Sequence, residues 1–290
     1  MRAKIDCIWY VSGFRRPWEA AVLSNLAAAL KARDFLAKPL RVYVSGGTAN
    51  FRVDGVLSWG SLNFFERAAL VLFRGRLWHL WGDAPLWWRW VRLRARTVHT
   101  SLDTHPRWWG HPTRLFAEQA SDGESLVVPA FEVKVAWMDG GGGEDFQPDA
   151  LLLAAEPSEV QREALAEIGE SVSLNALGSP SSLKKGKALF IDGSPSYVLL
   201  AAYLTLQGVP VVAKNTPLVR AVLGSGGCVV PGGDGKEDWK KAFREVMSEA
   251  GRSASASARR FLKANYSASA AGESLETLYR AVTGCSKKAE

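Results

Sequence analysis

Short apolar runs typical of β-strands alternate with stretches of helical periodicity along almost the whole chain. Strands separated by helices are expected to run parallel, because a parallel pair needs a long crossover and a helix usually supplies it. The alternation therefore predicts an α/β fold in which parallel sheets carry helices on both faces. The expected strands are residues 5–11, 40–44, 56–58, 77–80, 97–100, 126–128, 150–154, 171–176, 188–191, 209–213 and 228–230. The expected helices are 18–33, 61–73, 85–95, 158–168, a stretch starting near 197, 236–250, 254–264 and 267–282.

Four consecutive glycines, residues 140–143, interrupt this alternation near the middle of the chain. Glycine loses more conformational freedom than other residues on entering a helix or strand, so such a run fits a linker. We divide the 290 residues into an N-terminal Rossmann-like domain (1–139), a glycine-rich hinge (140–148) and a C-terminal Rossmann-like domain (149–290). The two domains are expected to face one another across a cleft.

Charge and tryptophan are divided unequally at the same place. The chain has 36 Lys and Arg against 29 Asp and Glu, a formal net charge of +7. Residues 1–137 hold 19 of the basic and 11 of the acidic residues, which leaves 17 basic and 18 acidic residues for the rest. Eleven of the twelve tryptophans also lie in residues 1–137. The excess positive charge therefore indicates the binding partners of the first domain.

Cysteine usage and hydropathy exclude several classes of protein. Cys7, Cys228 and Cys285 are far apart and form no Cys-x-x-Cys motif, so neither a disulfide framework nor a structural zinc site is expected. No apolar segment reaches the roughly 20 residues that a membrane span needs, and no signal-peptide core begins the sequence. We expect a cytoplasmic protein with no metal or cofactor.

Three loops of the second half follow expected strands and lead into expected helix starts, the second of them at Pro217. Parallel sheets bind ligands at the carboxyl ends of their strands, where helix N-termini offer free N–H groups and a partial positive charge. The loops predict phosphate binding, although each one alone also fits an ordinary capped helix start. The third loop is the glycine-rich turn 231–235. The candidate residues of the first two loops are Gly193, Ser194, Ser196, Lys214, Asn215 and Thr216.

Four segments of the second half follow one another in a recognisable order: 208–213 (Gly-Val-Pro-Val-Val-Ala), 216–220 (Thr-Pro-Leu-Val-Arg), 226–233 (Gly-Gly-Cys-Val-Val-Pro-Gly-Gly) and 278–280 (Leu-Tyr-Arg). This series resembles the C-terminal half of GT-B glycosyltransferases. It is most similar to the large retaining family, glycosyltransferase family 4-like, that includes sucrose synthases and mannosyltransferases. The resemblance implies a nucleotide-diphospho-sugar donor in the second domain, an acceptor against the first, and transfer with retention and without a metal ion.

The first domain resembles the same family more loosely, through Gly13 after the first strand and through residues 97–100. The resemblance implies that His99 contacts the donor sugar or its phosphate as a catalytic residue. Asp103, a second catalytic candidate, and His105 follow on the same loop, where we expect them to orient the acceptor. His99 also fits a strand-end residue whose side chain is satisfied structurally.

Gly13 is followed by two cations, Arg15 and Arg16, that are expected to face the cleft and to bind an anionic acceptor or a donor phosphate. A solvated loop is the alternative interpretation. At two positions where the resembled family carries glutamates, this chain has Pro195 and Tyr203 instead. The sequence therefore also fits a catalytically inactive GT-B-like protein that binds a carbohydrate or a partner.

Residues 85–96 are unusually rich in tryptophan and arginine. Trp and Arg suit a bilayer interface, and each basic residue near an anionic surface contributes on the order of 1 kcal/mol. The segment predicts a peripheral contact with the inner face of the cell membrane, with a lipid-linked or polysaccharide acceptor. A helix that packs its tryptophans on the sheet is the alternative, and RNA binding is a third reading that no motif supports, so no nucleic acid is expected. Nothing in the sequence specifies an oligomeric state. The predicted membrane patch is Trp87, Trp88, Arg89, Trp90, Arg92, Arg94 and Arg96.

Overall fold

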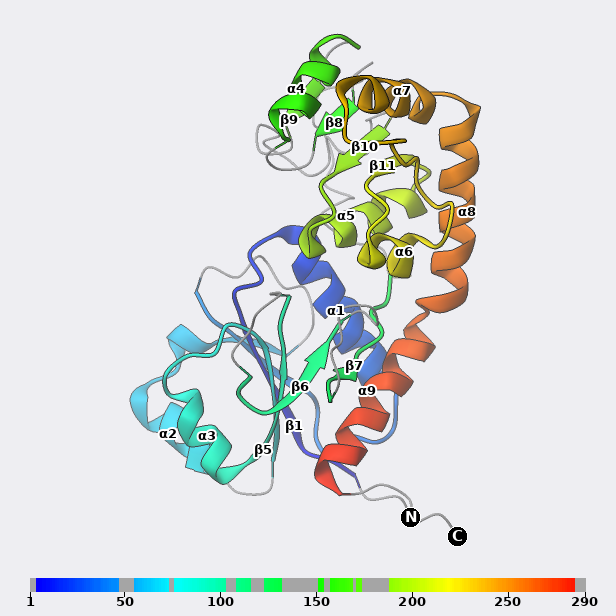
Figure 1. Cartoon of the computed structure of the whole chain (residues 1–290). Coiled ribbons are helices and arrows are strands. Elements are labelled where there is room, and N and C mark those ends of the chain that lie inside the picture. Colours follow the sequence, from blue (N-terminus) through cyan, green and yellow to red (C-terminus); the bar gives the residue numbers. More distant parts are fainter. Residues whose placement is uncertain are drawn as a thin grey trace, which may run out of the picture. The chain divides into compact units, whose positions relative to one another are not determined.

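Figure 1 shows the computed structural model of the chain. It describes residues 4–46, 55–72, 76–102, 108–115, 123–131, 151–153, 157–168, 171–173 and 188–284. The chain forms two compact units, one comprising Met1–Glu132 with Tyr266–Glu290 and the other Val133–Asn265. The expected glycine-rich hinge, 140–148, lies outside the described residues.

The first unit is built on a parallel sheet with the strand order β3-β2-β1-β4-β5-β6-β7. Each neighbouring pair of these strands is parallel. The order reverses between β1 and β4, as in a doubly wound Rossmann-like sheet. The strands are β1 (Cys7–Ser12), β2 (Arg41–Val44), β3 (Val56–Ser58), β4 (Leu77–Gly82), β5 (Arg96–Thr100), β6 (His111–Arg114) and β7 (Ser125–Leu126).

Aromatic side chains of β1 and β4 alternate between the two faces of this sheet. Tyr10 and Trp78 belong to a buried cluster that includes Trp88 of α3. Trp9 lies on the opposite face and donates a hydrogen bond to Tyr279 of α9. Successive residues of a strand point to opposite faces, so both faces of the sheet need a covering helix layer. The helices of this unit are α1 (Pro17–Lys31), the short 3₁₀ helix η1 (Trp59–Ser61), α2 (Phe64–Leu72), α3 (Trp88–Arg94) and α9 (Ala268–Thr283).

The C-terminal helix α9 belongs to the first unit, where it packs against α1 (Figure 1). Glu276 accepts a bond from Arg33 at 2.6 Å and another from Arg280 at 2.8 Å. A Cβ at Gly272 would lie only 2.9 Å from the Ala29 carbonyl oxygen, so glycine permits the close approach of the two helices. The sequence-based division assigned 149–290 to the second domain, and the structure differs because these long-range contacts return residues 266–290 to the first unit.

The second unit has a parallel four-stranded sheet in the order β11-β10-β8-β9. Its core includes Phe190, Trp239 and Phe243, whose rings meet at centroid distances of 5.3 to 5.6 Å. The strands are β8 (Leu151–Leu153), β9 (Ser171–Ser173), β10 (Ala188–Ile191) and β11 (Val211–Ala213). The helices are α4 (Glu159–Ala166), α5 (Pro195–Leu206), α6 (Pro217–Leu223), α7 (Lys236–Val246) and α8 (Glu249–Asn265).

The α/β class with two Rossmann-like parallel sheets is confirmed. One expected strand, 228–230, is only an isolated bridge between Val229 and Val212. The structure also has a strand that the sequence did not predict, β6. Among the described helices, none is both long and apolar enough to cross a membrane.

Candidate functional site

Two loops meet at the carboxyl edge of the second sheet, where β10 and β11 end side by side. Residues 192–194 lead into α5, and residues 214–216 lead into α6. A Cβ at Gly193 would lie 3.5 Å from Thr216 Cγ2, so the two loops are in contact. Gly193 has a φ of 87°, a left-handed conformation that glycine adopts without strain. The two loops predicted to bind a donor phosphate therefore lie together.

The helix starts at this edge differ in the charge of their first turns. Ser194 and Thr216 are the N-caps of α5 and α6, and neither helix has an acidic residue in its first turn. The third helix, α7, has Glu237 and Asp238 in its first turn. An anion is stabilised by the partial positive charge of a helix N-terminus, but a carboxylate already there opposes it. The starts of α5 and α6 therefore lack the first-turn carboxylates of α7, although the Asp192 carboxylate, which precedes α5, already accepts the Ser194 N–H.

The glycine-rich turn 231–235 surrounds the carboxylate of Asp238. A Cβ at Gly233 would lie 2.6 Å from Asp238 Oδ2, and one at Gly235 would lie 3.2 Å from the same atom. The turn thus accommodates the chain's own carboxylate in place of an external phosphate. It still contributes to the edge through Asp234, whose Oδ1 is 2.6 Å from Lys214 Nζ.

Lys214 is the cation of the two contacting loops. Its side chain is 48% exposed, and that of its partner Asp234 is 80% exposed. An ion pair this accessible contributes only about 0–1 kcal/mol, so a phosphate can replace the carboxylate at small cost. Asn215 is exposed and Ser196 is half-buried beside these loops. The Ser194 N–H donates to Asp192 Oδ1 at 2.8 Å, which fixes the turn before α5.

At the carboxyl edge of the first sheet, Gly13 and Asp83 lie together. A Cβ at Gly13 would be 2.5 Å from Asp83 Oδ2, and the Asp83 N–H donates to the Ser12 carbonyl at 3.1 Å. Gly82, which ends β4, has a φ of 89°. Asp83 is exposed, so its carboxylate is available to a ligand at this edge.

His99 lies in β5 and is 2% exposed. Its Nε2 is 2.7 Å from the Gly82 carbonyl oxygen, and its Nδ1 accepts the Trp109 N–H at 3.2 Å. Because Nδ1 is an acceptor here, the proton lies on Nε2 and is donated to Gly82. Burial lowers the pKa of His99 below its usual 6.5, while the bond to Gly82 and the nearby Asp83 carboxylate oppose that shift. The structure thus uses both ring nitrogens of His99 to hold neighbouring loops, and its catalytic role stays a prediction.

The other first-domain candidates are placed as follows. Asp103 and His105 lie outside the described residues. Arg15 is exposed in the loop after β1. The Arg16 guanidinium lies 5.3 Å from the centroid of the Trp18 ring, and its backbone N–H donates to Glu19 Oε2 at 2.9 Å. Arg15 is therefore the more accessible of the two predicted cations.

The structure divides the predicted membrane patch into buried and exposed members. Trp88 is fully buried, and Trp87 stacks on Trp59 at 4.5 Å, so these two rings complete the core of the first unit. Trp90 is 62% exposed. The guanidinium groups of Arg89 and Arg92 lie 5.1 and 5.5 Å from the Trp109 ring centroid, and Arg94 and Arg96 are exposed. Trp87 and Trp88 were therefore wrongly predicted to contact a membrane. Trp88 faces the core together with Val91, and Trp87 packs on Trp59.

Two features of the first edge were missed from the sequence. Asp83 follows β4 directly, as a ligand-binding residue of a parallel sheet often does, and this position was its only signal. The Trp108 ring contacts both the His99 ring, at a centroid distance of 5.3 Å, and the Arg114 guanidinium, at 4.9 Å. In the part of the chain that the structure describes, no group of three or more His, Cys, Asp or Glu side chains could hold a metal ion.

Comparisons with known proteins extend this description of the fold. No family model and no curated protein matches the chain. Among solved structures, HepE of Anabaena in complex with UDP-glucose matches with a TM-score of 0.63 and 9% identity over 94% of this chain and 99% of HepE. A glycosyltransferase from Rickettsia africae matches with a TM-score of 0.60 and 10% identity, over 96% and 98% of the two chains. A UDP-N-acetylglucosamine 2-epimerase matches with a TM-score of 0.55 and 14% identity, over 98% of each chain. The chain therefore has the GT-B fold, which it shares with glycosyltransferases and sugar epimerases.

Proposed function

We propose that the chain transfers a sugar from a nucleotide-diphospho-sugar to a lipid-linked or polysaccharide acceptor. The observation that supports this most is the contact between two helix-start loops without first-turn acids, in a fold whose solved neighbours include complexes with UDP and UDP-glucose. The reaction takes place in the cytoplasm, at the inner face of the membrane.

The donor diphosphate binds the N-termini of α5 and α6 in this proposal. Lys214 exchanges Asp234 for a phosphate oxygen, and Gly193 allows the backbone to approach the ligand closely. Ser194, Ser196, Asn215 and Thr216 supply hydrogen-bonding groups around it. Charge that develops on the departing diphosphate is then stabilised by oriented N–H groups and one lysine, so that no metal ion is required.

Transfer proceeds with retention. The bond between the anomeric carbon and the diphosphate oxygen breaks, and the acceptor oxygen forms its bond on the same face of the sugar. The acceptor proton goes to the departing diphosphate. Asp83, with Gly13 beside it, orients the acceptor hydroxyl. Arg15, exposed in the loop after β1, binds an anionic group of the acceptor, and His99 positions the loop that carries Asp83.

Calorimetric titration with UDP, GDP and ADP tests the donor site. We expect one of these nucleotides to bind and Lys214→Ala to weaken its binding about tenfold, the equivalent of one lost charge-assisted bond. Lys241→Ala is the matched control, because Lys241 is an exposed lysine on α7 that has no ion pair within the described chain. Absence of binding by all three nucleotides would remove the proposal.

A second candidate is a GT-B-like protein that binds a carbohydrate or a partner without catalysis. It is favoured by the two positions at which the resembled family carries glutamates. Pro195 opens α5, and Tyr203 is buried within the same helix, so neither position presents a carboxylate. Incubation with UDP-sugars separates the candidates: nucleotide release indicates transfer or hydrolysis, a changed sugar on intact nucleotide indicates epimerisation, and binding without either indicates the inactive protein.

A further inference from the structure

The most exposed large apolar side chains of the described residues gather on α2, on α3 and in the turn before α3. Leu86 is 84% exposed, Phe65 81%, Phe64 77%, Leu93 76% and Trp90 62%. The two helices contact each other (Figure 1). Single exposed apolar residues are ordinary, but a group of them marks an interaction site. We call this group, together with Leu72 at 54%, the α2–α3 apolar surface.

The core of the first unit is complete without these side chains. Inside the same helix α3, Trp88 and Val91 are fully buried, so Trp90 and Leu93 necessarily point away from the sheet. Asn63 and Glu66 cap α2 reciprocally, each accepting the other's backbone N–H at 2.8 Å. This cap fixes Phe64 and Phe65 at the first turn of α2. The exposed side chains therefore stand on ordered elements.

The charge around the α2–α3 apolar surface is positive. Residues 84–96 contain four arginines and no acidic residue. Arg94 and Arg96 form no ion pair with any part of the chain that the structure describes. The nearest acid of α2, Glu66, is engaged in the helix cap. Apolar and aromatic residues bordered by unpaired arginines are typical of surfaces that contact anionic lipid.

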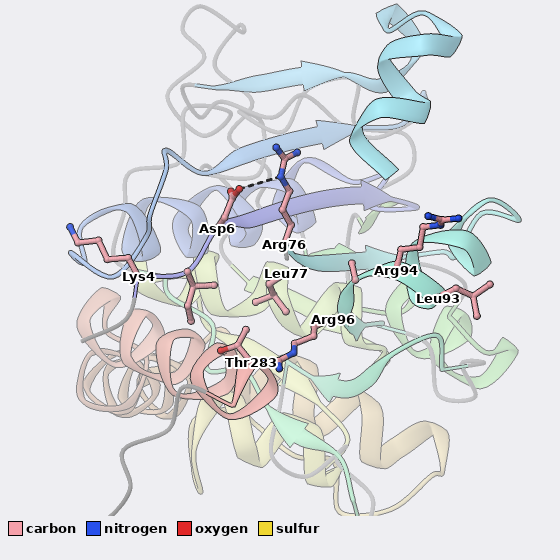
Figure 2. A pocket seen from close by; sticks show the side chains of 10 residues that line it. Lys4, Asp6, Arg76, Leu77, Leu93, Arg94, Arg96 and Thr283 are labelled. Atoms are coloured by element: carbon pink, nitrogen blue, oxygen red, sulfur yellow. Dashed lines mark ion pairs between the residues drawn. The ribbon is translucent and has the colours of Figure 1, made fainter. Parts of the chain in front are cut away.

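A hollow of about 460 Å³ adjoins this surface at the amino ends of β1, β4 and β5. Figure 2 shows Leu93 and Arg94 on one side of it and Lys4 on the other. Lys4 pairs with Asp34 at 2.6 Å, and Arg76 pairs with Asp6 at 3.2 Å. The remaining positive charge comes from Arg94 and Arg96, and Leu93 is shared with the α2–α3 apolar surface. The hollow thus places unneutralised guanidinium groups directly beside exposed apolar side chains.

We propose that this face docks on an anionic phospholipid bilayer. Phe64, Phe65, Trp90 and Leu93 enter the interfacial region, and headgroup phosphates bind Arg94 and Arg96 at the mouth of the hollow. The lipid-contacting residues are therefore largely different from Trp87 and Trp88. A protein partner needs matching carboxylates and a complementary apolar face, whereas a bilayer supplies phosphates and hydrocarbon to any exposed surface of this composition.

Co-sedimentation of the full chain with vesicles tests this proposal. The vesicles are phosphatidylcholine with 30% phosphatidylglycerol, compared with pure phosphatidylcholine, in about 0.1 and 0.5 M salt. Phe64→Ser with Phe65→Ser is expected to weaken binding at least about tenfold, since each phenylalanine loses its apolar burial. Arg94→Gln with Arg96→Gln is expected to weaken it about 25-fold in low salt and much less in high salt.

Two matched controls accompany these variants. Val160→Ser with Val230→Ser replaces exposed apolar residues of the second unit, and Arg259→Gln with Arg260→Gln removes the same charge from α8. Both controls are expected to bind like the unaltered chain. The proposal is overturned if the unaltered chain does not bind anionic vesicles, or if the controls lose as much binding as the variants.

A concentration-dependent self-association that Phe64→Ser and Phe65→Ser abolish, without vesicle binding, would assign the face to a protein contact and equally overturn the proposal. This docking face would supply the membrane contact of the proposed function and rests on it. Vesicle binding is measured without a nucleotide sugar, so its failure removes the membrane location, while the proposed donor site is tested separately by the nucleotide titration.

Discussion

Replacing Tyr279 with phenylalanine removes one oxygen atom from the buried network that attaches α9 to the first sheet. Trp9 Nε1 donates to the Tyr279 hydroxyl at 2.8 Å, and that hydroxyl lies 2.6 Å from His79 Nδ1. His79 Nε2 is 2.7 Å from Thr100 Oγ1, and Thr100 is bonded to Thr113. With the His79 proton on Nε2, each donor in this chain has an acceptor. Tyr279 is the one member that comes from α9.

The magnitude follows from the groups that lose their partner. Tyr279→Phe leaves His79 Nδ1 without a hydrogen bond in a fully buried place, and it leaves the Trp9 N–H only the weak acceptor Cys7 sulfur. Each such group costs about 1–3 kcal/mol, so we expect a loss of about 2–4 kcal/mol in the free energy of unfolding. For a unit of this size that corresponds to a decrease of roughly 6–12 °C in Tm.

Urea unfolding followed by tryptophan fluorescence measures this loss. Ten of the twelve tryptophans lie in residues 1–132, so the signal reports mainly the first unit. Tyr43→Phe is the matched control, because Tyr43 is buried in the same unit and its hydroxyl has no hydrogen bond among the described residues. A Tyr279→Phe loss below about 0.5 kcal/mol, equal to that of the control, would refute the network as the anchor of α9.

Three further predictions concern the first unit. Burial lowers the pKa of both His79 and His99 below 6.5, so below that pH the unfolded chain binds more protons than the folded chain. The free energy of unfolding should therefore be constant above about pH 6.5 and fall as the pH decreases. Urea unfolding at pH 8 and pH 5.5 would measure this difference. Equal stability at both pH values would contradict the buried, neutral state of these rings. Gly82→Ala should lower the free energy of unfolding by several kcal/mol, because φ is 89° and a Cβ would collide with the Ser12 carbonyl. Gly46→Ala is the control, since a Cβ there meets nothing within 4 Å. Equal Tm values for the two variants would argue against this geometry. Asp83→Asn should leave nucleotide affinity unchanged and lower turnover about 100-fold through loss of acceptor orientation, and an unchanged turnover would exclude that role.

The sequence predicted the parallel α/β class and the contact region of the second sheet for a simple reason. Neighbouring parallel strands end at the same edge, so loops that follow successive strands meet there, as Gly193 and Thr216 do. The roles proposed for these loops depend on ligand binding and remain predictions.

Other features depend on contacts far apart in the sequence. Helical periodicity marks α9 as amphipathic but does not say which sheet it covers, and the pairing of Arg33 with Glu276 spans 243 residues. In α3 the apolar residues surround most of the helix, so only the packing of Trp88 against Trp78 decides which tryptophan points inward. The strand β6 contains His111, Pro112 and Arg114, and its pairing with β5 outweighs its weak strand propensity.

Hydrogen exchange of the chain with and without UDP tests the central claim most directly, because it locates the ligand on the backbone. Slower exchange is expected in residues 192–198 and 214–219, where the N-termini of α5 and α6 would bind the diphosphate. Residues 249–265, which form α8, serve as the internal reference and should exchange unchanged. Binding of UDP without protection in 192–198 and 214–219 would contradict the proposed donor site.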